Sequence, residues 1–165
     1  MMDDRPHIAR PVLAAAGVAV GIAVLGALTT DLGPWYQALH KPAWKPPDAL
    51  FGPMWTLIFA LAAASFVLYW SRARSRNERL EVIAAFLLNG VLNVLWSLLF
   101  FRLERPDWAL WEVGPLWLSI VAMMGLVRRS SAVAPLLLLP YLVWVMLAAV
   151  LNWKVVMLNA PFGHG

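Results

Sequence analysis

Five long apolar runs constrain this sequence more than any other feature. They cover about residues 11–30, 50–70, 80–101, 108–127 and 132–154, and each carries at most one charged residue. An α-helix needs roughly 20 apolar residues to cross the hydrocarbon core of a bilayer. A backbone in that core must satisfy its own hydrogen bonds, so runs of this length predict helices. The sequence therefore predicts an all-α integral membrane bundle of five transmembrane helices, with a long structured loop at 31–52 between the first two.

The composition agrees with a membrane location and excludes several kinds of site. The chain is 62% hydrophobic and 13% charged, whereas soluble domains are about 45–50% apolar and about 25% charged. It has no cysteine, so disulfides, thiolate metal sites and a cysteine nucleophile are excluded. Its three histidines, His7, His40 and His164, are scattered, and we expect no metal site. The connectors are too short to fold alone, so residues 1–165 are expected to form one domain.

The basic residues indicate how the chain is oriented. With five spans the termini lie on opposite sides of the membrane. Eight basic residues fall on the N-terminal side (Arg5, Arg10, Arg72, Arg74, Arg76, Arg79, Arg128, Arg129) and five on the other (Lys41, Lys45, Arg102, Arg105, Lys154). The positive-inside rule then predicts a cytoplasmic N-terminus in a bacterial inner membrane, with a dual or inverted topology as the alternative. This distribution also explains the basic pI without nucleic-acid binding.

The connector between the first two spans is unusually aromatic and stiff. It reads "WYQALHKPAWKPPDALFGPMW" from Trp35 to Trp55. Its prolines at 42, 46 and 47 fix φ and remove N–H donors, so the segment cannot collapse into a helix or a sheet. Pro53 suits the first turn of the following helix. We interpret the connector as a lid over a cavity.

Polar and aromatic side chains of several spans gather in the membrane half beneath this connector. Asn89, Asn93 and Trp96 share one face of the third span, and Tyr141, Trp144 and Ala148 share one face of the fifth. Convergent polar groups in an apolar surrounding predict a ligand site. The alternative for the two asparagines is hydrogen bonding between helices. For Glu112 it is an ion pair with a residue such as Arg105, or a protonated acid.

Small residues predict places where helices approach closely. Gly17 and Gly21 form a G-x-x-x-G spacing in the first span, and Ala84, Ala85 and Gly90 form a similar strip in the third. Such spacing permits close packing of transmembrane helices. A homodimer and packing within one chain both remain open as explanations.

Three motifs follow one another along nearly the whole chain: the connector, "LNVLWSLLFF" in the third span and "PYLVWVMLAAVLN" in the fifth. Together they resemble the TspO/MBR family, the tryptophan-rich sensory proteins, translocator proteins and peripheral-type benzodiazepine receptors. The connector resembles the family's W-Y-x-x-L-x-K-P-x-W-x-P-P followed by F-x-P-x-W. "LNVLWSLLFF" resembles N-x-x-W-S/T-x-x-F-F, and "PYLVWVMLAAVLN" resembles P-Y-x-x-W-x-x-x-A-x-x-L-N. The resemblance implies a five-helix bundle, usually dimeric, that binds porphyrins such as protoporphyrin IX and haem under the first loop.

By motif position, the resemblance implies a particular set of ligand-binding residues. These are Tyr36, Trp44, Trp55, Asn93, Trp96, Tyr141, Trp144 and Ala148. His40, Lys41 and Lys45 are candidate contacts for the porphyrin propionates. Cholesterol, which animal members bind, is doubtful here, because the segment "LNWKVVML" has Trp153 where the sterol motif needs a tyrosine.

We therefore expect a membrane receptor or sensor of porphyrins with a role in tetrapyrrole or stress regulation. No catalytic residues or required cofactor are expected. The alternatives are light-dependent breakdown of the bound porphyrin, driven by the ligand's own photochemistry, and transport of tetrapyrroles or other amphipathic molecules. The lack of internal repeats argues against transport.

Overall fold

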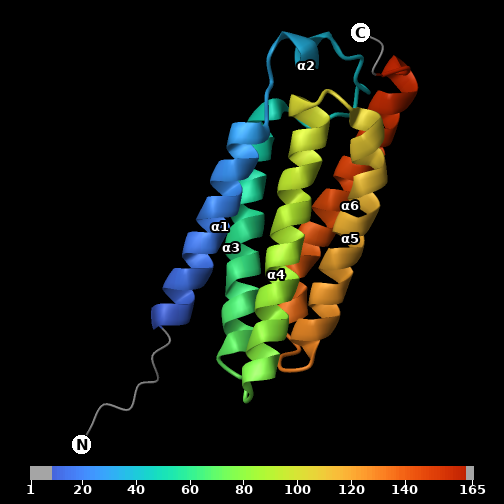
Figure 1. The fold of residues 1–165 in the computed structure, drawn as a ribbon. Coiled ribbons are helices and arrows are strands. Elements are labelled where there is room, and N and C mark those ends of the chain that lie inside the picture. The colour runs from blue at the N-terminus through green and yellow to red at the C-terminus, as the bar shows by residue number, and fades with distance from the viewer. Residues whose placement is uncertain (1–8, 163–165) are drawn as a thin grey trace, which may run out of the picture.

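The protein folds into a bundle of long helices that run side by side (Figure 1). The computed structural model describes residues 9–162. Within that range the long helices are α1 (Ala9–Thr29), α3 (Phe51–Trp70), α4 (Arg76–Ser97), α5 (Pro106–Arg128) and α6 (Ala134–Asn159). The described residues contain no strand. The predicted all-α bundle of five long helices is confirmed.

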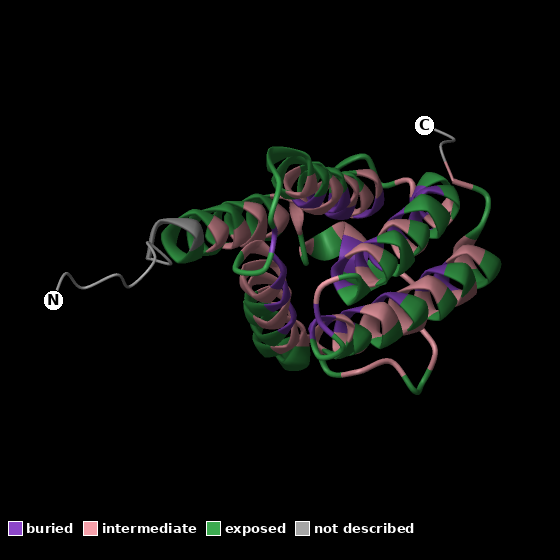
Figure 2. Cartoon of the chain, turned by 90° about the horizontal axis from the view of Figure 1, so that it is seen from below, coloured by how far each residue is buried: buried purple, intermediate pink, exposed green. Residues whose placement is uncertain are grey.

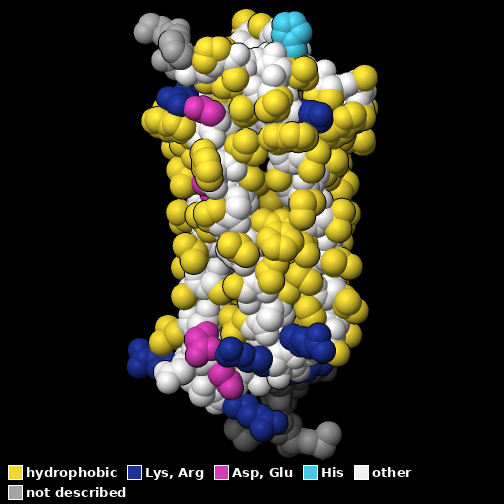
Figure 3. Space-filling model, turned by 90° about the vertical axis from the view of Figure 1, so that its right-hand side faces the viewer, with side chains coloured by type: hydrophobic (Ala, Val, Ile, Leu, Met, Phe, Trp, Pro, Cys, Tyr) yellow, Lys and Arg dark blue, Asp and Glu magenta, His cyan; other side chains and the backbone are white. Residues whose placement is uncertain are grey.

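All five long helices are long and apolar enough to cross a membrane. The space-filling view shows a broad hydrophobic belt, with Lys, Arg, Asp and Glu side chains gathered near the two ends (Figure 3). Charged side chains are costly in the core of a bilayer. An apolar belt with charges at both ends therefore fits a protein whose belt spans the core and whose charges lie at the two surfaces. The chain is therefore a multi-pass membrane protein.

Local signals explain where the helices begin and end. α4 starts behind a capping box, in which Ser75 Oγ accepts a bond from the Glu78 N–H and the Glu78 carboxylate accepts one from the Ser75 N–H. α5 starts with Pro106, whose missing N–H costs nothing at a first helical position. The predicted third span continues past Ser97 as the π-helical turn η2 (Leu98–Arg102). The last helix ends at Asn159 rather than at the predicted Lys154.

The helices form a ring in the order α1, α3, α6, α5, α4 and back to α1. Seen along the bundle, the buried positions face its interior and the exposed positions face outward (Figure 2). Buried clusters join α3, α4, α5 and α6 along the bundle. None of the α1 side chains described is buried. α1 therefore lies against α3 and α4 without entering the packed core.

The connector forms a cap at the end of the bundle that also holds η2 and the end of α6 (Figure 1). It contains one short helix, α2 (Pro34–Ala38), and the 3₁₀ turn η1 (Asp48–Leu50), which leads into α3. The α3–α4 and α5–α6 connections lie at the opposite end. The cap covers the half of the bundle in which the sequence placed its ligand site.

Candidate functional site

A cavity of about 420 Å³ lies beneath the connector, between α1, α3, α4 and α6. We call it the loop-side cavity. Six of the eight residues predicted to bind ligand lie on its wall: Tyr36, Trp55, Asn93, Trp96, Trp144 and Ala148. Its volume falls in the usual range for small-molecule sites, roughly 300–1,000 Å³. The tertiary structure thus brings together residues from the connector and three different helices.

Aromatic rings hold one another in place around this cavity. Trp55 stacks on Phe59 with ring centroids 5.4 Å apart, and its ring meets that of Tyr141 edge-on at 5.9 Å. Trp144 meets Phe51 edge-on at 5.6 Å. Offset-stacked and edge-to-face pairs are the favoured arrangements of aromatic rings. The indoles that line the cavity are therefore positioned before any ligand binds.

Three polar side chains form a hydrogen-bonded group below the indoles. The Tyr141 hydroxyl donates to Asn89 Oδ1 and accepts from Asn93 Nδ2, both at 3.1 Å. Asn89 Nδ2 donates to Ser119 Oγ of α5 at 2.8 Å. Both asparagines thus form hydrogen bonds between helices, which is the alternative to ligand binding given for them above. Asn93 also lines the cavity, whereas Asn89 and Tyr141 line a second cavity on the other side of the group.

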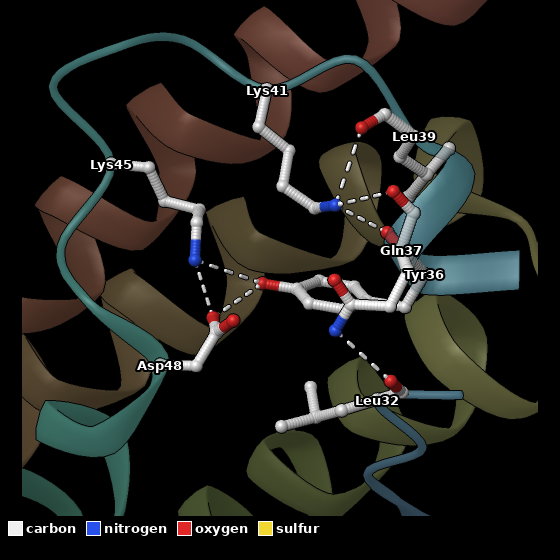
Figure 4. Close-up of polar contacts among 7 residues, drawn as sticks. All are labelled: Leu32, Tyr36, Gln37, Leu39, Lys41, Lys45 and Asp48. Atoms are coloured by element: carbon white, nitrogen blue, oxygen red, sulfur yellow. Dashed lines mark hydrogen bonds and ion pairs between the residues drawn. The ribbon is translucent and has the colours of Figure 1, made fainter. Parts of the chain in front are cut away.

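A polar cluster fastens the connector above the cavity (Figure 4). The Tyr36 hydroxyl donates to Asp48 Oδ1 at 2.9 Å, and Lys45 Nζ forms an ion pair with the same carboxylate. Burial, reinforced by the bond to Asp48, raises the pKa of Tyr36 well above its ordinary value. The hydroxyl therefore stays protonated and remains a donor. Asp48, which the sequence did not single out, is part of the cavity wall.

The other predicted propionate contacts also have partners within the protein. Lys41 Nζ donates to the backbone carbonyls of Tyr36, Gln37 and Leu39, so it closes the end of α2 (Figure 4). His40 is held through its backbone, because its N–H donates to Asn159 Oδ1 and its carbonyl accepts from Asn159 Nδ2, both at 2.8 Å. Neither Lys41, Lys45 nor His40 lies on the wall of the loop-side cavity.

Two residues of the predicted set lie elsewhere. The Trp44 side chain is 46% exposed and does not line the loop-side cavity. Tyr141 is buried and contacts the site through Trp55 and Asn93. α1 supplies a part of the wall that the sequence did not predict, including Ala23, Gly26 and Ala27. No polar or aromatic signal marks these small residues, and only the packing of α1 beside α3 and α4 brings them to the cavity.

Glu112 does not form the ion pair considered for it. Arg105 pairs with Asp107 instead, with Nε donating to Oδ1 at 2.7 Å. Glu112 is buried on the inner face of α5, and neither of its carboxylate oxygens has a hydrogen-bond partner among the described residues. The described residues also contain no group of three His, Asp or Glu side chains that could hold a metal ion.

Comparison with known proteins finds one family that matches most of the chain. Residues 12–158 match the TspO/MBR family. "Tryptophan-rich protein TspO" of Archaeoglobus fulgidus is 34% identical over 88% of this chain and 93% of its own length. The protein of the same name from Chlorobaculum tepidum is 37% identical over 76% and 79%. The human "Translocator protein" is 30% identical over 73% and 72%.

Proposed function

The chain belongs to the TspO/MBR family, and on that premise we propose that it is a membrane receptor that binds a porphyrin, such as protoporphyrin IX or haem, in the loop-side cavity. The observation that carries the proposal is the aromatic wall of a cavity of about 420 Å³ under a fastened connector. The bound porphyrin would act as a signal in tetrapyrrole or stress regulation.

The chemistry of the wall suits a flat apolar ring system with acidic substituents. Trp55 and Trp144 offer indole surfaces to the macrocycle, and Asn93 offers an amide. Two propionates need cations, and Lys45 is held beside the wall by its pair with Asp48. A propionate that binds Lys45 takes the place of Asp48, so ligand binding loosens the cluster that fastens the connector.

Tryptophan substitutions test the assignment of the cavity. Removing one indole from an apolar ring contact costs about 1 to 2 kcal/mol, or roughly fivefold to thirtyfold in affinity. We expect Trp55→Ala and Trp144→Ala each to weaken protoporphyrin binding by that factor, measured by titration of the Soret band in detergent. Trp111→Ala is the matched control, because Trp111 is 84% exposed and is not among the residues that line the cavity. Unchanged affinity in both cavity variants would overturn the pocket assignment.

Movement of the connector is a second consequence of the proposal. If a propionate replaces Asp48 at Lys45, amide exchange across residues 35–52 changes when protoporphyrin is added. Hydrogen exchange with mass spectrometry measures this directly, and peptides of the α5–α6 connection serve as the internal reference. Identical protection with and without ligand would mean that the connector is a static cover.

Light separates the receptor role from porphyrin breakdown. Illumination of a stoichiometric complex bleaches the Soret band only in the presence of protein if the protein promotes breakdown. A receptor alone leaves the bleaching rate of the complex no higher than that of free porphyrin. Trp55→Ala and Trp144→Ala then show whether bleaching depends on the indoles beside the ligand, because both residues line the cavity.

We also propose an orientation and an assembly. The protein lies in a bacterial inner membrane with its N-terminus on the cytoplasmic side. The arginine-rich segment between α3 and α4 lies on the same side as the N-terminus, and basic residues favour the cytoplasmic side. Arg5, which contributes to this bias, lies outside the described residues.

The protein forms a homodimer through the exposed face of α1 that carries Gly17 and Gly21, where a Cβ added to either glycine meets no atom within 4 Å.

A further inference from the structure

A second cavity lies in the opposite half of the bundle from the connector. Its volume is about 410 Å³, and we call it the lipid-side cavity. α1, α3 and α4 supply its walls, with Ala15, Ala19, Ala63, Phe66, Phe86 and Gly90 among the lining residues. It ends at Trp70, the last residue of α3. No part of the porphyrin proposal uses this cavity.

The lining of the lipid-side cavity selects for hydrocarbon. The polar groups on its wall belong to Asn89, Tyr141 and Trp70, and the first two already bond to each other. Burying an unpaired polar group against the remaining alanine, valine, isoleucine, leucine and phenylalanine side chains would cost several kcal/mol. A saturated or unsaturated acyl chain carries no such group. The cavity therefore fits a chain of methylenes better than a polar metabolite.

The cavity is open to the membrane. Its wall includes Val18 of α1 and Leu87 of α4, whose side chains are 44% and 46% exposed. Both helices are long and apolar enough to span the bilayer, so these exposed positions face lipid. An acyl chain can therefore enter sideways from the bilayer without crossing a polar barrier.

Positive charge gathers at the end of the cavity that Trp70 marks. The Arg79 guanidinium lies over the Trp70 ring, 5.1 Å from its centroid. Arg72 and Arg74 lie in the α3–α4 connection, and Arg76 is the first residue of α4. The two nearby carboxylates are already engaged, since Glu78 closes the capping box and Glu81 pairs with Arg129. Basic residues at a membrane surface attract anionic headgroups by about 1 kcal/mol each.

We propose that this cavity and the arginines beside it form a binding site for one anionic phospholipid. One acyl chain lies in the lipid-side cavity, and the phosphate group lies beside Arg79 at the membrane surface. The lipid chain fills space that the side chains of α1, α3 and α4 leave open, and so stabilises the contact of α1, which has no buried side chain among those described. The site is separate from the loop-side cavity, with the Asn89–Tyr141 pair between them.

Native mass spectrometry after extraction from nanodiscs tests this site. The nanodiscs contain equal amounts of dioleoyl phosphatidylglycerol and dioleoyl phosphatidylcholine, which differ only in the headgroup. We expect one phosphatidylglycerol molecule per chain to be retained in preference to phosphatidylcholine. Arg79→Gln should lower its retention about fivefold, the effect of losing one basic residue beside an anionic lipid. Arg128→Gln, an exposed arginine at the end of α5, should leave it unchanged.

A second pair of variants tests the acyl chain. Ala63→Leu fills the cavity from α3 and should lower retention of the lipid, whereas Ala60→Leu on an exposed part of the same helix should not. Ala19→Leu fills the cavity from α1 and replaces Ala63→Leu if that variant fails to fold. Equal retention of the two lipids by the unmodified protein would overturn the proposal. So would equal effects of Arg79→Gln and Arg128→Gln, or a cavity substitution that behaves like Ala60→Leu.

Discussion

At the scale of single residues, Tyr141 joins several helices at the candidate site. Its hydroxyl bonds to two asparagines of α4, and its ring supports Trp55. Asn89 extends the group to Ser119 of α5. The residue thus links α3, α4 and α6 at the level where the two cavities meet. Removing its hydroxyl leaves a buried donor and a buried acceptor without partners.

We expect Tyr141→Phe to destabilise the protein by about 1 kcal/mol, because interhelical hydrogen bonds in membranes contribute roughly 0.6 to 1.7 kcal/mol each. Thermal unfolding in a mild detergent measures the loss as a lower Tm. Tyr69→Phe is the matched control, since Tyr69 is also buried but its hydroxyl forms no hydrogen bond with the described residues. An equal fall in Tm for both variants would contradict a role for the hydrogen-bonded group.

At the scale of elements, the connector is fastened at two separate places. Near its end, the Tyr36–Asp48–Lys45 cluster joins α2 to η1. Near its middle, the Asn159 side chain at the end of α6 holds both backbone groups of His40. A segment rich in proline cannot bond to itself as a helix or a sheet does. Side chains from distant parts of the chain therefore hold it in place.

Asn159→Ala removes the second attachment. Each hydrogen bond contributes a net 0.5 to 1.5 kcal/mol, so the loss of two should speed local amide exchange around residues 39–41 by about tenfold. Hydrogen exchange followed by mass spectrometry reports this, with α5 peptides unchanged. Asn77→Ala serves as control, because Asn77 is exposed on α4 at the other end of the bundle. Unaltered exchange at 39–41 would mean that the connector keeps its place without Asn159.

At the scale of the whole molecule, α1 is the least integrated of the long helices. The glycines of α1 and the glycine of α4 that faces it have different surroundings. Gly90 of α4 contacts the Ile22 side chain of α1, whose Cδ1 would clash with a Cβ added at Gly90. That close approach belongs to packing within one chain. Gly17 and Gly21 have open space in front of them, so their face is available to a second copy.

The proposed homodimer is tested by enlarging that face. Gly17→Leu combined with Gly21→Leu should prevent close approach of two α1 helices and reduce the cross-linked dimer in native membranes severalfold. Gly125→Leu provides the control, because Gly125 also has open space around it but lies on α5. A dimer band that is the same in all variants would place the interface elsewhere, and monomer at every protein loading would exclude the dimer.

The sequence by itself determined the five spans, because the length and apolarity of each run are local properties that the bilayer alone selects. It also determined most of the cavity wall, since helical periodicity placed Asn93 and Trp96 on one face and Trp144 and Ala148 on another. Only the tertiary structure decided the partners of the charged residues. Arg102 donates to the Leu28 carbonyl of α1, and Arg129 pairs with Glu81 of α4, although neither partner is near in sequence.

The part of the cavity walls that α1 supplies also depends on the tertiary structure. α1 is an apolar helix of small residues, and no side of it is marked in the sequence as the one that packs on the bundle. Its apolar side chains can face either lipid or protein. Its placement against α3 and α4 leaves one cavity beneath the connector and a second one open to lipid. Both follow from how helices from distant parts of the chain pack together, which no local pattern records.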